Sequence, residues 1–265
     1  MKAYFLFLAA MLCCISRIEA QKKEQLDYAE QSKFILSLEA GGLIPVHGFS
    51  SQDPFLKNAT NIDKGGGFFP LTRVTYFFSK KWGAEFEFLP WILKPSNTGQ
   101  AQQYLINQYI SKYYVNASSP MTNPDALVVS FMIGPTYKIT SGRFMILPKL
   151  LFGINSYDGM MSNYSLHLKE KNGNEIIDNQ YNWNQDASST QVGWVLSPTC
   201  SFSYRLLRRI GINVSANYLY CPSVRITYTT TEQNYKLQQQ TSQTYVYKSS
   251  LQNVTVGAGI SFLIK

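Results

Sequence analysis

Residues 210–220 of this 265-residue chain, IGINVSANYLY, decide the fold. Apolar or aromatic side chains take every second position from Ile210 to Tyr220, and small or polar side chains lie between them: Gly211, Asn213, Ser215 and Asn217. A repeat of two residues over this length is typical of a β-strand, because a helical face would repeat every ~3.6 residues. We therefore expect a strand with two chemically different faces.

The same alternation returns in seven further segments. They are 34–44, 69–79, 83–93, 125–138, 143–157, 190–205 and 253–264. Each is close to, or longer than, the roughly 9–11 residues that a tilted strand needs to cross a bilayer.

The connections between these segments are of two kinds. Three are short, at 79–82, 140–142 and 206–209, and four are long and polar, at 45–68, 94–124, 158–189 and 226–248. Short turns at one end and long loops at the other are typical of membrane barrels. The sequence predicts an all-β fold: an eight-stranded antiparallel up-and-down transmembrane β-barrel with short periplasmic turns and four long extracellular loops.

A soluble, lipocalin-like barrel would alternate too, with its bulky face turned inward. Here the second face carries Gly, Ser, Thr and Asn with few charges, and charged residues are 15% of the whole chain. A water-facing surface normally carries roughly 25–35% charged residues. Eight inward rows of bulky side chains would also overfill so small a barrel. The pattern favours lipid outside and small polar residues inside.

The N-terminus indicates export. Lys2 precedes an apolar run over 3–15, and Ile18-Glu19-Ala20 ends the segment, so we expect a signal peptide over 1–20. A lipid-modified Cys13 or Cys14 is disfavoured, because Leu12 lies where a small residue is needed. A polar lead over 21–32 and the barrel over 33–265 follow. Loss of Lys2, Arg17 and Glu19 lowers the net charge from +8 to +7. For an exported chain we expect lipid partners and no nucleic acid.

Three stretches carry a family resemblance: Gly134-Pro135-Thr136-Tyr137-Lys138, the turn after Ser203-Tyr204-Arg205, and GAGISF at 257–262. They resemble the small outer-membrane β-barrel proteins of Gram-negative bacteria, the OmpA/OmpX-like, porin-like group, from about Phe34 to the end. The resemblance implies outer-membrane localisation and a C-terminal strand read by the barrel-assembly machinery, although the chain ends on Lys265 and not on an aromatic residue. Anchors, adhesins and accessory subunits all occur in this group.

Six charged residues fall on the polar face of the predicted strands. We expect them to form a paired cluster inside the barrel, because an isolated buried charge is costly. They are Glu39, Arg73, Glu85, Glu87, Lys138 and Lys149.

Six basic residues and no acidic residue flank the short turns. Either they are solvated, or they form a periplasmic-side rim that binds the phosphates of lipid headgroups. They are Lys80, Lys81, Arg143, Arg205, Arg208 and Arg209.

The long loops contain both histidines, His47 and His167, each near serine and acidic residues. A lipid-modifying enzyme or a protease could use either one, but neither surrounding matches a catalytic motif. No His/Cys spacing indicates a metal site, and no cofactor is expected. We therefore expect a non-enzymatic barrel that presents its loops as an anchor, adhesin-like or partner-contacting surface, or else an accessory subunit of a secretion or assembly complex.

Three smaller expectations concern the loops and cysteines. Asn172-Gly173 predicts a hairpin in the third long loop. Eight loop tyrosines either make contacts or form an upper aromatic girdle, and the girdle is favoured: Tyr104, Tyr109, Tyr113, Tyr114, Tyr228, Tyr235, Tyr245 and Tyr247. Cys200 and Cys221 fall on opposite faces of neighbouring strands and are offset by about seven residues along the strand direction. We therefore expect no disulfide between them.

Overall fold

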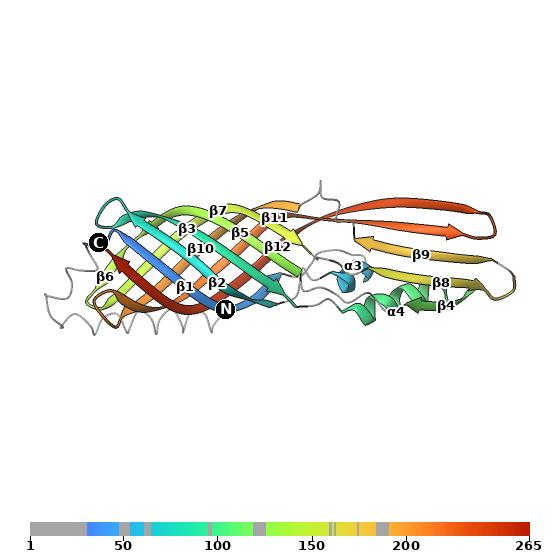
Figure 1. Cartoon of the computed structure of the whole chain (residues 1–265), viewed down its shortest axis with the longest axis horizontal. Coiled ribbons are helices and arrows are strands. Elements are labelled where there is room, and N and C mark those ends of the chain that lie inside the picture. Colours follow the sequence, from blue (N-terminus) through green and yellow to red (C-terminus); the bar gives the residue numbers. More distant parts are fainter. Residues whose placement is uncertain are drawn as a thin grey trace.

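The computed structural model describes residues 31–47, 54–60, 65–94, 97–118, 126–158, 161, 163–173, 175–183 and 191–265. The expected signal peptide over 1–20 and most of the polar lead over 21–32 lie outside these ranges. Within them, the chain forms a barrel that continues at one end into a long extension (Figure 1).

Eight antiparallel strands close the barrel, as predicted. They are β1 (Phe34–His47), β2 (Gly66–Phe77), β3 (Trp82–Leu93), β5 (Ala126–Tyr137), β7 (Phe144–Asp158), β10 (Gln191–Arg205), β11 (Ile210–Asn234) and β12 (Gln239–Ile264). Each pairs with the next in this order, and β12 pairs back with β1. The short strand β6 (Ile139–Ser141) only extends the turn before β7. The prediction of an eight-stranded up-and-down barrel is confirmed.

The two faces of the wall differ as the alternation predicts. Ile133, Phe152 and Trp194 are among many large apolar side chains that are more than 40% exposed on the outside. The opposite positions, such as Ser215 and Thr255, are buried in the interior. Because an apolar outer surface is stable against lipid and not against water, this barrel spans a membrane. The lipocalin-like alternative is wrong.

The interior is layered along the barrel axis. At the short-turn end an apolar layer consists of Ile35, Phe77, Met145, Leu147 and Leu263. A polar, charged layer fills the middle. Towards the long-loop end the interior becomes apolar again, with residues such as Leu89, Trp91 and Leu151. The small polar residues expected inside from the sequence fill the middle of the barrel, whereas the apolar layers at the two ends were not predicted.

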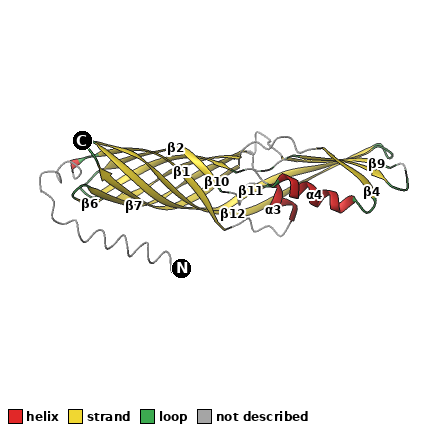
Figure 2. Ribbon diagram, turned by 90° about the horizontal axis from the view of Figure 1, so that it is seen from below, coloured by secondary structure: helices red, strands yellow, loops and turns green. Residues whose placement is uncertain are grey.

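Beyond the barrel, the strands β11 and β12 run on as a hairpin that pairs with three further strands. The order is β12–β11–β9–β8–β4, with β4 (Tyr113–Ser118), β8 (Tyr164–Glu170) and β9 (Ile176–Trp183). The predicted hairpin around Gly173 is confirmed as β8 and β9. Figure 2 shows this extension continuing the long axis of the barrel.

Two helices that the sequence did not predict lie along the extension, α3 (Pro54–Ala59) and α4 (Thr98–Tyr109). In α4, Ala101 and Leu105 are buried against the extension, and the Asn97 side chain caps its N-terminus. Among the described residues, no helix is long and apolar enough to cross a bilayer. The extension is a folded unit, and its buried residues belong to the same hydrophobic cluster as the upper interior of the barrel.

Candidate functional site

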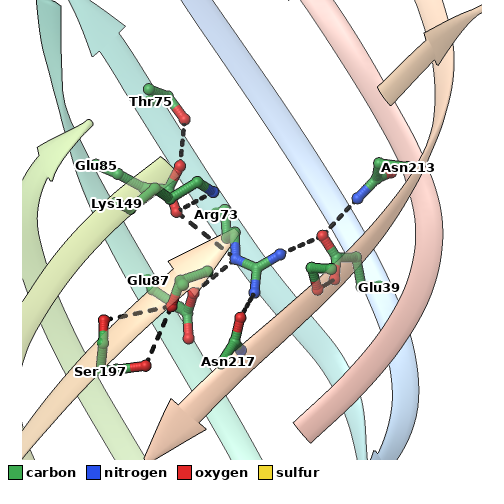
Figure 3. Close-up of polar contacts among 11 residues, drawn as sticks. Glu39, Arg73, Thr75, Glu85, Glu87, Lys149, Ser197, Asn213 and Asn217 are labelled. Carbon is green, nitrogen blue, oxygen red and sulfur yellow. Dashed lines mark hydrogen bonds and ion pairs between the residues drawn. The ribbon is translucent and has the colours of Figure 1, made fainter. Parts of the chain in front are cut away.

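The middle layer of the barrel holds an ion-pair cluster centred on Arg73. Its Nε lies 2.6 Å from a carboxylate oxygen of Glu87 and 3.6 Å from one of Glu85, and its Nη1 contacts Glu39. Lys149 reaches Glu85 at 2.6 Å. Figure 3 shows the guanidinium between Glu39 and Glu87. The five side chains come from four strands, so the cluster ties β1, β2, β3 and β7 together across the interior.

Neutral side chains complete this cluster. Asn213 and Ser215 of β11 donate to Glu39, and the Asn217 carboxamide oxygen accepts from Arg73 at 3.1 Å. Thr75 donates to Glu85 at 2.6 Å. The small polar face of residues 210–220, which decided the fold, thus supplies hydrogen bonds that a buried carboxylate requires.

Lys138, the sixth expected member, lies elsewhere. Thr136 pairs with Lys149, so Lys138 lies level with Leu147, two residues nearer the short turns and in the apolar layer. There its ammonium donates to the Ser32 carbonyl at 3.2 Å and lies 4.1 Å from the centre of the Phe77 ring. The alternation gave the right face, but it could not give the depth, because depth depends on register.

The predicted basic residues gather at the short-turn end, with one difference. Lys80, Lys81, Arg143, Arg208 and Arg209 are exposed. Arg205 instead turns inward, is buried, and donates to the Gly142 carbonyl at 3.1 Å.

Cross-strand aromatic pairs lie on the outer face just above these turns. Their ring centres are 4.9 Å apart in each pair: Phe34–Tyr76, Trp82–Tyr137 and Phe144–Tyr204. Such a band is typical of the level where a barrel meets the lipid headgroups. The aromatic girdle is thus found at the short-turn end, where the sequence analysis had not placed one.

The two histidines are not brought into one site by any contact in the described structure. His167 Nδ1 lies 2.5 Å from Asp178 across the β8–β9 pairing, on the exposed side of the hairpin, and Tyr235 donates to the same carboxylate at 2.6 Å. His47 ends β1 and is level with Gln252, and its side chain lies outside the described part. Within the described ranges, no group of three His, Cys, Asp or Glu side chains could hold a metal ion.

A groove of about 780 Å³ lies in the extension, between α4 and the strands β9, β11 and β12. Six of its sixteen lining residues are tyrosines: Tyr104, Tyr109, Tyr181, Tyr228, Tyr245 and Tyr247. The volume is within the range of roughly 300–1,000 Å³ that small-molecule sites occupy.

Most of the loop tyrosines lie in or beside this groove and do not form an upper girdle. Tyr228 is buried and stacks on Tyr245 and Tyr247, with ring centres 5.1 and 6.0 Å apart. Tyr109 and Tyr181 place their hydroxyl oxygens 3.3 Å apart, and burial raises the pKa of Tyr181. The favoured expectation of an upper girdle is wrong for these residues.

Sequence reasoning missed Asn179 and Tyr181, the contributions of β9 to the groove. Both belong to the strand paired with β11, where Asn179 is level with Glu232. A signal was present in β11 and β12, since Tyr228 and Thr230, and likewise Gln243, Tyr245 and Tyr247, recur every second residue and share a face.

The geometry defines a class: a transmembrane β-barrel that carries a folded, groove-bearing extension at its long-loop end. No protein-family model and no curated protein sequence matches the chain.

Solved structures of outer-membrane proteins are similar in outline. OprG from Pseudomonas aeruginosa is 12% identical, with 88% of this chain and 96% of that chain covered and a TM-score of 0.44. A major outer membrane protein from Thermus thermophilus is 9% identical, with coverage of 87% and 99% and a TM-score of 0.39. Ail, the attachment invasion locus protein of Yersinia pestis, is 12% identical, with coverage of 87% and 97% and a TM-score of 0.32. The class therefore rests on the geometry of the chain itself.

Proposed function

We propose that this chain is a non-enzymatic integral protein of the outer membrane, whose barrel anchors a binding unit outside the cell. One observation carries the proposal. A single hydrophobic cluster joins Leu93 and Leu151 of the barrel interior to Phe55, Leu105 and Leu166 of the extension. A unit with a core continuous with its anchor is held in a fixed position, and pre-organised surfaces bind at a lower entropic cost.

The orientation follows from the two ends of the barrel. Short turns lie on the periplasmic side in barrels of this kind, and long connections lie outside. The exposed basic residues Lys80, Lys81, Arg143, Arg208 and Arg209 lie beside the aromatic girdle. We propose that they hold the phosphates of the inner leaflet, where each base gains about 1 kcal/mol near an anionic surface.

The C-terminal strand supports a proposed contact during assembly. β12 pairs with β1 from Ile264 to Val254 without a break in register. This strand closes the barrel against β1, and we propose that the assembly machinery receives the chain through it.

A catalytic role has weaker support. His167 and Asp178 form a contact that a hydrolase could use, but both lie on an exposed hairpin and not in a cavity that would exclude water. Assays of lipid hydrolysis and peptide cleavage with the wild type, His47→Ala and His167→Ala test this alternative. Turnover by the wild type that either substitution abolishes would contradict the non-enzymatic role.

Purification from native membranes in mild detergent separates the anchor role from the accessory role. We expect a chain that is isolated without stoichiometric partners and that migrates differently on a gel after boiling in SDS, because a closed barrel resists cold SDS. Co-purification of secretion or assembly subunits in fixed ratio would support the accessory role and contradict the proposal.

A further inference from the structure

We infer that the groove between α4 and the β11–β12 hairpin binds an uncharged carbohydrate chain. The inference rests on the proposed function, since it names the ligand class of the binding unit. It is drawn from the charge, the aromatic faces and the hydrogen-bonding groups of the sixteen lining residues.

The charge of the groove excludes anionic ligands. Among its sixteen described lining residues there is no lysine or arginine, and Glu232 is the one carboxylic acid. A phosphate, sulfate or carboxylate would bind there without a cation to pair with it, which is unfavourable. A purely apolar ligand fits no better, because only Phe55 and Leu105 among the lining residues lack a polar side-chain atom.

The aromatic faces favour a sugar ring. Tyr228, Tyr245 and Tyr247 form a stack whose planes are tilted by only 19° and 6°. An aromatic face is the negative pole of the ring's quadrupole. The carbon-bound hydrogens of a pyranose carry a small positive charge, so a flat sugar face packs well against such a surface. Tyrosine also loses little conformational entropy on binding, because it has two side-chain torsions.

The polar groups suit hydroxyls. The Asn179 side chain is 5% exposed and lines the groove, and its amide donates to the Tyr109 hydroxyl at 3.1 Å. Its carbonyl oxygen accepts no hydrogen bond within the described part of the chain. This oxygen is shielded from solvent, so hydrogen bonds to a ligand come from the other polar groups of the groove. Gln108, Gln243 and four Ser or Thr hydroxyls supply further donors and acceptors.

A peptide is the competing ligand for this groove. Peptides usually add to a free strand edge through backbone hydrogen bonds. In the groove, β11 is paired on both sides, with β9 and with β12, from Tyr228 to Asn234, so it offers side chains and no unpaired edge. Among the described residues, β12 pairs only with β11 over 239–248, and its outer edge is the place where a peptide would add. The tyrosine faces and the hydroxyl-rich lining favour the sugar over this peptide.

An array of short neutral oligosaccharides, with sulfated and sialylated forms and a peptide array beside it, tests the inference on the purified full chain in detergent. We expect binding to neutral sugars that Tyr245→Ala weakens by about tenfold, the effect of losing one ring face. Tyr245→Phe keeps the face and should retain most of the affinity. Tyr114→Ala, an exposed tyrosine outside the groove, is the matched control and should bind as the wild type does.

The outcomes separate the two proposals. Binding to peptides or to anionic sugars only, or neutral-sugar binding that Tyr245→Ala leaves unchanged, would overturn the carbohydrate inference and leave the external binding role standing. If the arrays show no binding, the carbohydrate inference is wrong. If, in addition, cells with the protein adhere to the tested surfaces no better than cells without it, the binding role is wrong too.

Discussion

Arg73 and Glu87 face each other across the β2–β3 pairing, and the guanidinium Nε lies 2.6 Å from the carboxylate. Both side chains are at most 1% exposed. Together with Glu39, Glu85 and Lys149, this pair makes a cluster of three carboxylates and two cations inside a barrel whose outer face is apolar. The pair is therefore the centre of a network in which removing one charge leaves another without its partner.

Lys149→Met should destabilise the barrel by about 3–5 kcal/mol, because Glu85 would lose its 2.6 Å contact in a buried site. Urea unfolding in detergent, followed by the heat-dependent gel shift, measures this change. Lys169→Met, at an exposed position of β8, is the control and should change stability by less than about 0.5 kcal/mol. Combining Lys149→Met with Glu85→Gln should cost less than the two changes summed. Additive costs would mean that the two charges do not interact.

Gly41 and Gly42 are adjacent but should respond oppositely to alanine. A Cβ at Gly41 would lie 2.1 Å from the Val256 carbonyl oxygen and 2.6 Å from the Phe68 ring, whereas at Gly42 the nearest atom is 3.9 Å away. Gly41→Ala should cost about 1–3 kcal/mol through overpacking, and Gly42→Ala should be neutral or slightly stabilising. The folded fraction on cold SDS gels measures both. Equal behaviour of the two variants would contradict the register of β1 with β2 and β12.

The two cysteines should stay free and should differ in reactivity. Leu196 pairs with Tyr220, so Cys221 is level with Val195, five residues from Cys200 and not the seven expected from the sequence. That offset is about 16 Å, too far for a disulfide. Titration should count two thiols in unfolded mature protein. In the folded protein an apolar maleimide should label the partly exposed Cys200 much faster than the buried Cys221. Faster labelling of Cys221 than of Cys200 would contradict the assignment of the inner and outer faces of β10 and β11.

Acid should loosen the extension before the barrel. Glu175 accepts hydrogen bonds from Asn234 at 2.9 Å and Tyr113 at 3.0 Å, and these contacts hold its pKa below the usual 4.5. A lowered folded-state pKa stabilises the fold above about pH 4.5, and this contribution is lost as the pH falls through the folded-state pKa. Hydrogen exchange of peptides from 164–183 should rise on acidification in the wild type. In Glu175→Gln the pH-dependent part should disappear, and its persistence would show that another group is responsible.

The barrel was predictable because its wall separates two media. Each strand of the wall, for example residues 210–220, turns one face to lipid and the other to a packed interior. Its side chains therefore alternate between apolar and polar, and this period of two can be recognised in the sequence. The alternation fails where both faces are apolar. Leu89, Trp91 and Leu93 point inward and Ile92 points outward, so the apolar upper interior could not be separated from the outer belt.

The extension was harder to predict for two reasons. Helix α4 buries only Ala101 and Leu105, a signal too weak to stand out in a polar connection. The groove depends on the pairing of β9 with β11, which brings Asn179 level with Glu232 across some fifty residues of chain. Register between distant segments is not encoded in local periodicity.

The most direct test of the account is the topology of the barrel in intact cells. In a Cys200→Ser/Cys221→Ser background, Gln240→Cys places a thiol on the β11–β12 hairpin, and Lys80→Cys places one in a short turn. A membrane-impermeant maleimide should label the first in intact cells, and the second only after the outer membrane is permeabilised. Equal labelling of both in intact cells, or recovery of the protein in the soluble fraction, would contradict a barrel that spans the outer membrane and holds its binding unit outside.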